Sequence, residues 1–372
     1  MPDGSREGLG PETGPRWSLR RKTRSAKAIR LMIAFAIGSL GAFCFLLIKV
    51  PLAWFLGSLA FCLVAAVLNV PYERPRAFSS PVRVVLGVTV GTAFTPTLLG
   101  NLGGMVGSLL LLIPYMFAIM GAGMLFFSRL ARFDKPTAFF SAVPGGLTDM
   151  VTMATDAGAN TRAVTLVQAV RIVMIVFLLP FWVQMTGDRA IGGVMPPGVH
   201  ITELSLFDAA VLIGLGCGGW QIAKMLGMAG APLVGPMIVS GIAHATGLTA
   251  AKVPIEVIIF AQITLGILLG AQFRGVTWRE FSTTLVWGGI YAVMLVAVTA
   301  VVAIGVSRLT GFDSTNVLLA FSPGGQAELN LLAYILHLDV AFTALHHLVR
   351  IAIVIAAAQI VFASNKSWRN GS

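Results

Sequence analysis

The sequence predicts an all-α integral membrane protein with about ten transmembrane helices in two inverted repeats, each carrying a re-entrant Pro-Gly-Gly loop. Three features indicate this fold: little charge, ten apolar stretches and an internal duplication. Only 11% of the 372 residues are charged, whereas 56% are hydrophobic, and the mean hydropathy is +0.86. Because a soluble domain carries about 25% charged residues, most of the surface of this chain must face lipid.

The ten apolar stretches approach the roughly 20 residues that a helix needs to cross a bilayer. The first five lie at 28–48, 51–70, 81–99, 104–127 and 161–184. The second five lie at 207–227, 231–249, 254–273, 283–307 and 339–363. Between the fourth and fifth stretch of each set is a shorter segment with Gly, Pro and Thr, at 136–156 and 315–336.

The two sets align at an offset of 179 residues, as from Pro144 to Pro323. The residues that keep this register are Gly87, Gly91, Phe133, Asp134, Pro144, Gly145, Gly146 and Arg171, which match Gly266, Gly270, Phe312, Asp313, Pro323, Gly324, Gly325 and Arg350. Pro51-Leu52 matches Pro232-Leu233 at an offset of 181, which predicts a two-residue insertion. The paired Gly-x-x-x-Gly motifs predict close helix packing.

The interrupted segments decide how the repeats are oriented. If each dips into the membrane and returns, a repeat has five spans and the second is inverted; if each crosses, a repeat has six spans and the repeats are parallel. Lys and Arg counts barely separate the two arrangements. A Pro-Gly-Gly break frees backbone groups that are tolerated at membrane depth only inside protein or beside a water-filled cavity. Paired interrupted segments are typical of inverted-repeat transporters, so we favour the re-entrant arrangement.

The basic N-terminal segment predicts the orientation in the membrane. Seven Lys and Arg residues crowd positions 16–30, and by the positive-inside rule they place the N-terminus in the cytoplasm. The predicted organisation is a disordered basic tail (1–27), membrane repeat 1 (28–184), a linker (185–206), membrane repeat 2 (207–363) and a cytoplasmic tail (364–372).

The two Pro-Gly-Gly segments carry the candidate functional residues. In each, a carboxylate follows the second glycine by three residues, and an arginine follows the carboxylate by 22 residues in the next apolar stretch. Because a charge in the bilayer is costly, the sequence predicts Asp149–Arg171 and Glu328–Arg350 pairs. The predicted binding residues are Pro144, Gly145, Gly146, Thr148, Asp149, Arg171, Pro323, Gly324, Gly325, Gln326, Glu328, Asn330 and Arg350.

Two readings of these residues remain open. In the first, the glycine backbones, polar side chains and arginines bind a solute or ion near the midplane; in the second, each pair pins its loop to the next helix. Asp149, Glu328, His346 and His347 are candidates for proton coupling, since histidine titrates near neutral pH. The two adjacent histidines cannot share one helix face, so at most one of them is expected to point at the site. We predict no metal site, no cofactor and no catalytic residue.

The segments SAVPGGLTDM and FSPGGQAELN, each inside a duplicated unit that ends in an Arg-bearing helix, resemble the AbrB-type inner-membrane protein family of bacteria. The resemblance extends from about residue 28 to 363. Members carry labels such as ammonia monooxygenase or AbrB family regulator, and the resemblance implies a link to regulation of gene expression. The plan is also similar to that of secondary transporters with five spans and a Gly-Gly re-entrant loop per inverted half, although fold does not fix function.

Three hypotheses for function follow. The first is a secondary transporter of a small polar or anionic solute, coupled to H⁺ or Na⁺. The second is a membrane-bound sensor or regulator that uses the same pocket, and the third, for which no ligand set is present, is a membrane oxidoreductase. The expected partners are the lipid bilayer, the solute and its coupling ion, with a homodimer left open and no nucleic acid.

Overall fold

The described part of the chain in the computed structural model, residues 16–94, 96–186 and 196–365, is almost entirely helical. β-Pairing within it is limited to an isolated bridge between Val199 and Pro254. The first-half helices are α1 (Arg16–Leu47), α2 (Ala53–Val67), α3 (Ser79–Gly91), α4 (Pro96–Arg129), α5 (Lys135–Ala142), α6 (Leu147–Asp156) and α7 (Thr161–Thr186). The second-half helices are α8 (Leu206–Met225), α9 (Ala231–Ala245), α10 (Ile255–Gly270), α11 (Trp278–Thr310), α12 (Ser314–Phe321), α13 (Gln326–Ile335) and α14 (Val340–Ser364).

Seven of the described helices are long and apolar enough to cross a membrane, namely α1, α4, α7, α8, α10, α11 and α14. The chain therefore has the helices of a multi-pass membrane protein. The other three predicted stretches correspond to α2, α3 and α9, with 15, 13 and 15 residues. At about 1.5 Å per residue these are shorter than the roughly 30 Å hydrocarbon core.

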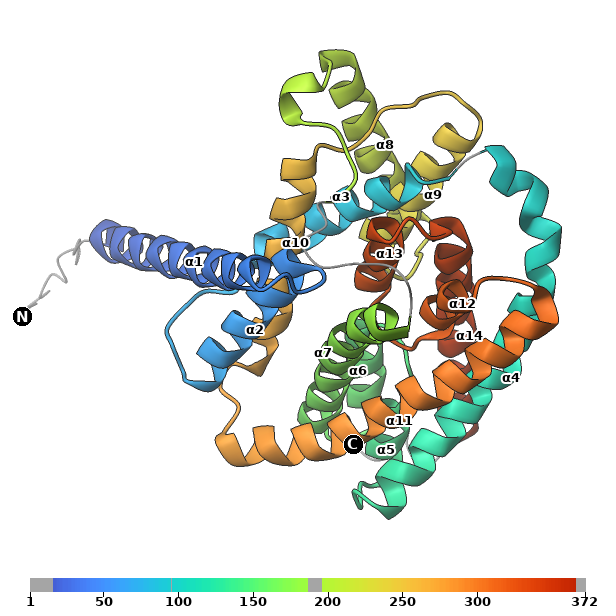
Figure 1. Cartoon of the computed structure of the whole chain (residues 1–372). Helices are drawn as coiled ribbons and strands as arrows, with labels where there is room; N and C mark the ends of the chain where they lie inside the picture. Colours follow the sequence, from blue (N-terminus) through green and yellow to red (C-terminus); the bar gives the residue numbers. More distant parts are fainter. Residues whose placement is uncertain (1–15, 95, 187–195, 366–372) are drawn as a thin grey trace, which may run out of the picture.

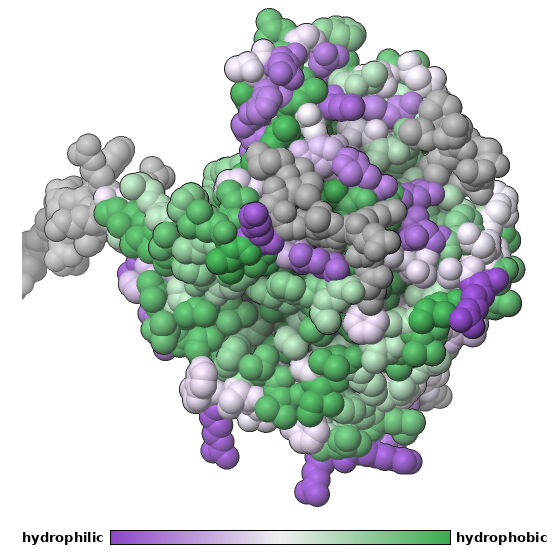
Figure 2. Space-filling model, in the orientation of Figure 1, coloured by the Kyte–Doolittle hydropathy of each residue, from purple (hydrophilic) through white to green (hydrophobic). Residues whose placement is uncertain are grey.

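The outer surface is apolar where a soluble protein would be polar. Hydrophobic residues cover much of the face in Figure 2, and hydrophilic ones gather towards its upper part and lower edge. Large apolar side chains stand exposed on several helices, among them Met32, Leu110, Ile213 and Val301. Continuous apolar surface of this kind marks a membrane or partner contact, and here the long apolar helices favour lipid.

The internal duplication is visible in the helix boundaries. α5 and α6 begin and end 179 residues before α12 and α13. Packing follows the same rule, because α2 contacts α10 as α9 contacts α3, and α7 contacts α11 as α14 contacts α4. The two halves are thus copies of one unit that exchange equivalent contacts.

The register of the first two helices differs from the predicted one. Gly41 crosses Gly57 backbone to backbone, and Gly219 crosses Gly235 in the same way, which relates α1 and α2 to α8 and α9 by 178 residues. The predicted match of Pro51-Leu52 to Pro232-Leu233 at an offset of 181 is therefore wrong. Leu52, in the left-handed conformation before α2, corresponds to Gly230, which has the same conformation before α9.

The helices form two groups (Figure 1). In one, α2 and α9 pack against α10 and α3, which also contact each other, and α1 and α8 lie outside them. In the other, α4 and α11 cross each other and hold α5–α7 and α12–α14. The predicted close packing at the glycine motifs is confirmed, since a Cβ on Gly87 would meet the Leu233 carbonyl and one on Gly266 would meet α2.

Each broken segment folds back so that its two ends lie together. The Asn160 N–H after α6 donates to Thr137 Oγ1 at the start of α5, over 2.9 Å. At the equivalent positions the Asp339 N–H donates to Asn316 Oδ1, over 3.2 Å. α5–α6 and α12–α13 are therefore helical hairpins, here called hairpin 1 and hairpin 2, with the Pro-Gly-Gly segments at their tips.

The predicted tails and linker are only partly described. α1 begins at Arg16, so part of the segment predicted to be a disordered tail is helical, because basic residues continue the helix that the apolar stretch forms. Residues 1–15 and 366–372 and part of the linker (187–195) lie outside the described residues. The described remainder of the linker lies against the α10 N-terminus, where the Ile255 N–H donates to the Val199 carbonyl over 3.0 Å.

An exposed ion pair fixes this linker. His200 Nδ1 lies 3.0 Å from Glu256 Oε1, and the Ile201 N–H donates to Glu256 Oε2 over 3.1 Å. The hydrogen bond to Glu256, its charge and that of Glu203 raise the pKa of His200.

We expect the stability that this pair contributes to be present at low pH and lost as the pH rises. A raised folded-state pKa means that folding favours the charged imidazole, so the contribution is complete below the ordinary histidine pKa of about 6.5 and disappears above the raised value. The difference in melting temperature between wild type and His200→Gln should therefore be larger near pH 5.5 than near pH 8.5, by roughly a degree or two, because exposed pairs are weak. A pH-independent difference would contradict this assignment.

Candidate functional site

The site begins with two helix breaks at the hairpin tips. α5 ends at Ala142, Val143 is extended, and α6 starts after an extended Gly146. Proline removes a backbone donor, so the carbonyls before it lose helical partners. Ser322 and Gly325 have the same extended conformations in hairpin 2. Each tip therefore exposes carbonyls of one short helix and N–H groups of the next.

Both carboxylates occupy the third position of the helix that follows the break. A Cβ on Gly146 would lie 2.7 Å from Asp149 Oδ2, and one on Gly325 would collide with Glu328 Oε2. The carboxylates thus fold back over glycines, where the positive end of the helix dipole favours negative charge. Glu328 is buried, with 7% of its surface exposed, whereas Asp149 is half-buried.

The arginines do not pair with these carboxylates, so the predicted Asp149–Arg171 and Glu328–Arg350 pairs are wrong. Arg171 Nη1 donates to the Val143 carbonyl over 3.2 Å. Arg350 donates to the Ser322 carbonyl and, over 3.2 Å, to the Gly324 carbonyl. The ion pairs between described residues are Arg162–Glu280 and His200–Glu256. The guanidinium instead satisfies carbonyls that the break leaves free, since unpaired backbone groups are costly in this environment.

His347 and Gln168 hold equivalent positions, 179 residues apart, and bind equivalent carbonyls. Gln168 Nε2 donates to the Phe140 carbonyl over 2.7 Å, and His347 Nε2 lies 3.1 Å from the Leu319 carbonyl. His346 points elsewhere, towards Ser108 Oγ on α4 at 2.9 Å. The two histidines thus point in different directions, and His347 is the one that helps to anchor hairpin 2.

We expect His347→Gln to keep hairpin 2 anchored. The matching glutamine in repeat 1 makes the same backbone contact, so a glutamine should hold hairpin 2 and change the free energy of unfolding by no more than about 1 kcal/mol. Thermal unfolding and hydrogen exchange over 319–330, measured on His347→Gln and His347→Ala, would check this. If the glutamine variant loses as much stability as the alanine variant, the contact with the Leu319 carbonyl does not hold hairpin 2.

The remaining predicted residues lie on the same hairpins. Pro144, Gly145, Pro323 and Gly324 form the tips, and Gln326 begins α13. Asn330 is fully buried on α13, with its Nδ2 3.9 Å from Met237 Sδ on α9. Thr148 lies in the first turn of α6, and its side chain is outside the described part of the structure.

Arg83 is a cation on α3, the helix of the other group that packs on α13, and the sequence did not single it out. Its Nη1 donates to Ser79 Oγ over 2.6 Å. The equivalent of Arg83 in the repeat register is Gln262 on α10, which is fully buried. Its position inside the apolar stretch 81–99 was the signal that could have identified it.

The two hairpins are packed differently against the other helix group. Among the described residues, α13 and α14 pack on α3, and α4 packs on α9, whereas in the equivalent position α7 contacts the turn Ala271–Phe273 that follows α10, and α6 and α11 make less contact with α10 and α2. Hairpin 2 is accordingly buried over Ala327–Ile335, whereas Gly146 at the tip of hairpin 1 is exposed. The two repeats thus have the same fold but differ in how deeply their hairpins are buried.

Comparisons with known proteins agree with this architecture. A family described as "Transition state regulatory protein AbrB" matches residues 54–364. The chain belongs to the AbrB family. It is similar to the protein YhjN of Bacillus subtilis (strain 168), with 27% identity over 346 residues that cover 86% of this chain and 89% of the relative. It is also similar to a protein of Escherichia coli (strain K12) named as an AbrB regulator, with 25% identity over 290 residues that cover 76% of this chain and 80% of the relative.

Family membership confirms the resemblance drawn from the Pro-Gly-Gly segments, which lie well inside the matched range. The family description names a regulatory protein rather than an enzyme. Among the described residues, no three His, Cys, Asp or Glu side chains are grouped so as to hold a metal ion.

Proposed function

We propose that this AbrB-family protein is an ion-coupled secondary transporter of a small polar or anionic solute, which binds between the tips of two re-entrant hairpins. In this topology seven long and three short helices give ten spans, five in each repeat. Because five is an odd number, the second repeat has the opposite orientation in the membrane. The return of each hairpin to its starting side supports re-entry. The basic residues of α1 support a cytoplasmic N-terminus, in a bacterial inner membrane.

One observation carries this proposal: unpaired polar atoms gather at the hairpins. Of the eleven buried side-chain polar atoms without a partner among the described residues, six belong to the hairpins or the helices that anchor them. These are Ser141 Oγ, Arg171 Nε, Gln326 Nε2, Asn330 Oδ1, His347 Nδ1 and Arg350 Nε. Because buried polar groups are normally satisfied by protein, water or ligand, a solute that supplies acceptors and donors would complete them.

The charges favour an anionic group on the solute. Arg171 and Arg350 place one buried guanidinium at each hairpin tip, and an anion bound beside them would offset their charge. The free N–H groups at the N-termini of α6 and α13, one N-terminus at each tip, also favour anions. Asp149 and Glu328 compete for those N–H groups, so protonation or binding of Na⁺ at these carboxylates would be coupled to solute binding.

The unequal packing of the hairpins supports alternating access. The group that holds the hairpins packs more extensively on α3 and α9 than on α10 and α2. Since the two halves are copies, exchanging the two sets of contacts gives a second state of comparable energy, in which hairpin 2 is open and hairpin 1 is closed. In the proposed topology the present state is open to the cytoplasm.

The test is ligand-induced thermal stabilisation of the purified protein, screened with small anions and amino acids across pH and Na⁺ concentration. We expect a bound solute to raise the melting temperature of wild type, by a free energy of about 2.7 kcal/mol at a hundredfold excess over Kd. Asp149→Asn and Glu328→Gln should bind the solute with altered pH or Na⁺ dependence. A hit would then be tested for flux in liposomes.

Asp156→Asn is the matched control, because Asp156 is an exposed carboxylate at the far end of the same helix as Asp149. It should behave as wild type in both assays. If all three variants bind alike, or if the site variants only melt earlier and no compound separates them from wild type, the carboxylates are structural and the proposed site is wrong.

A sensor or regulator is the second candidate, favoured by the regulatory description of the family and by the name of the E. coli relative. It uses the same hairpin site, so binding alone does not distinguish it from a transporter. Flux does: a solute that stabilises the protein and is not moved across liposomes, in either direction and with either ion gradient, would favour the regulator.

A further inference from the structure

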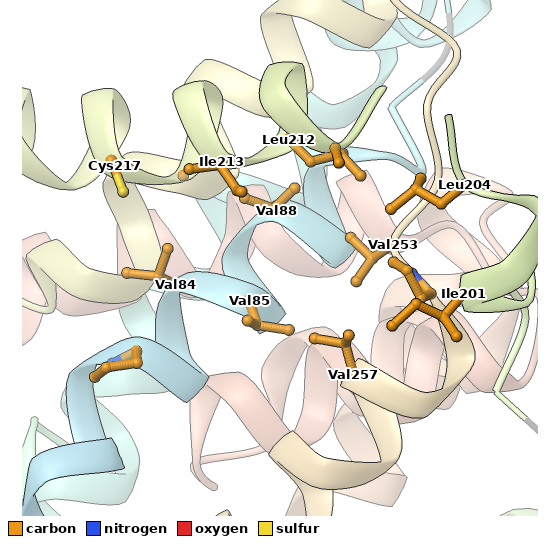
Figure 3. Close-up of a pocket in the computed structure, with 14 residues that line it drawn as sticks. Val84, Val85, Val88, Ile201, Leu204, Leu212, Ile213, Cys217, Val253 and Val257 are labelled. Carbon is orange, nitrogen blue, oxygen red and sulfur yellow. The ribbon is translucent and has the colours of Figure 1, made fainter. Parts of the chain in front are cut away.

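A cavity of about 360 Å³ lies between α3, α8, α10 and the described part of the linker, away from the two hairpins. Figure 3 shows the labelled side chains of these elements around one space. Val85 on α3, Ile213 on α8 and Val257 on α10 line it, and Ile201 of the linker closes one end. Its size falls at the lower end of the roughly 300–1,000 Å³ of ligand sites.

The walls of the cavity exclude water as its occupant. Every side chain that lines it is aliphatic, a proline or the Cys217 thiol, apart from one glycine. Water in a cavity needs two to four polar partners, and apolar cavities stay dry and accept apolar molecules. An empty space of this size would lose the dispersion contacts of its entire lining.

The internal repeat shows what belongs in this position. In the other half, Phe35, Phe78 and Phe260 form a cluster, with ring centroids 5.7 to 6.1 Å apart. In the repeat register their counterparts are Ile213, Val257 and Pro81, and all three line the cavity. One half therefore fills the position with its own aromatic rings, whereas the other has smaller side chains there and leaves the volume to an apolar guest.

The cavity opens at the lipid-facing surface. Ile201 and Ile213 are 55% and 65% exposed, although they also line the cavity. The main packing partners of α8 are α9 and α3. The outer face of α8 is apolar, and Leu206 and Phe207 are exposed on it. An apolar guest can thus enter from the bilayer without crossing water.

We propose that this cavity binds one hydrocarbon chain of a bilayer lipid, as a fixed component of the helix group that carries α3. The hydrocarbon chain is the apolar molecule that the bilayer supplies at the cavity mouth. Because α3 also packs on α13, the chain would support the helix on which hairpin 2 closes.

The test is photocrosslinking in liposomes made with a phospholipid that carries a diazirine near the middle of one acyl chain, followed by peptide mass spectrometry. We expect crosslinks at the buried lining residues Val88, Leu212 and Val253, which bulk lipid does not reach, and few at Phe35 and Phe78. Filling the cavity with Ile213→Phe and Val257→Phe, the side chains of the other half, should remove most of the crosslinks at these buried residues. Equal labelling of both halves in wild type, or undiminished labelling of the filled variant, would overturn the proposal.

The reverse variant protects the test against misfolding of the filled protein. Phe78→Val with Phe260→Ala opens the equivalent position in the first half, and we expect new crosslinks on α1 and α10 at a level similar to those of the natural cavity. No gain there would count against the proposal, since volume alone should then admit a chain. If purified wild type instead retains an apolar compound that is not a lipid, and the filled variant loses it, the occupant is a solute and the lipid proposal is wrong.

Discussion

Gly219→Ala is expected to destabilise the protein by about 1–3 kcal/mol, the usual cost of overpacking. A Cβ at this position would lie 2.8 Å from the backbone C and O of Gly235 and from Pro236 Cα. No side chain can rotate to make room, so α8 and α9 must separate. Thermal unfolding in detergent, or of protein in nanodiscs, would show a melting temperature lower by several degrees.

The neighbouring residue supplies the control. Gly218 lies on the same helix, and a Cβ there would meet nothing within 4 Å. Gly218→Ala should leave stability unchanged or raise it by up to about 1 kcal/mol, because alanine is the better helix former. If the two variants melt together, the glycine crossing does not set the distance between these helices. Gly41→Ala repeats the test in the first half, where the same crossing occurs.

Composition and repeats were enough to predict the membrane class and the duplicated hairpins. A long apolar helix is easy to recognise because each of its roughly 20 residues adds to its mean hydropathy. The Pro-Gly-Gly motif, repeated at a fixed offset, locates the tips of the two hairpins. The match at Pro51 failed because a single Pro-Leu dipeptide carries little information. Which glycines cross backbone to backbone, and hence the offset of 178, depends on tertiary contacts that no local pattern records.

The sequence located the polar residues at the two helix breaks but did not predict which groups they contact. The sequence placed a carboxylate and an arginine beside each break, and we paired them as opposite charges. In the folded chain Arg350 donates to the Ser322 and Gly324 carbonyls, because the helix break leaves these backbone acceptors free beside the guanidinium. The cavity beneath α8 was also beyond the sequence, since its existence depends on Ile213 and Val257 standing where the other half has phenylalanine.

Arg350→Met should cause the largest loss of function outside the carboxylates. The substitution keeps the length of the side chain but leaves the Ser322 and Gly324 carbonyls without a donor, at about 1–3 kcal/mol for each buried group. The tip of hairpin 2, which carries the buried Glu328, would then no longer be held to α14. We expect faster hydrogen exchange over 322–330, a lower melting temperature and loss of solute stabilisation.

Two further variants, Arg350→Lys and Arg308→Met, separate the effect of the backbone contacts from that of positive charge and serve as controls. Lysine keeps the charge but lacks the planar fork that reaches two carbonyls at once, so it should restore stability in part and function less. Arg308 is exposed at the end of α11, and its loss should change neither the exchange of hairpin 2 nor solute binding. Should Arg350→Lys recover both fully, positive charge alone would matter at this position, and the backbone contacts would be incidental. If Arg350→Met leaves the exchange rates of hairpin 2 unchanged, the hairpin is held by its apolar packing on α3 and α14 rather than by the guanidinium.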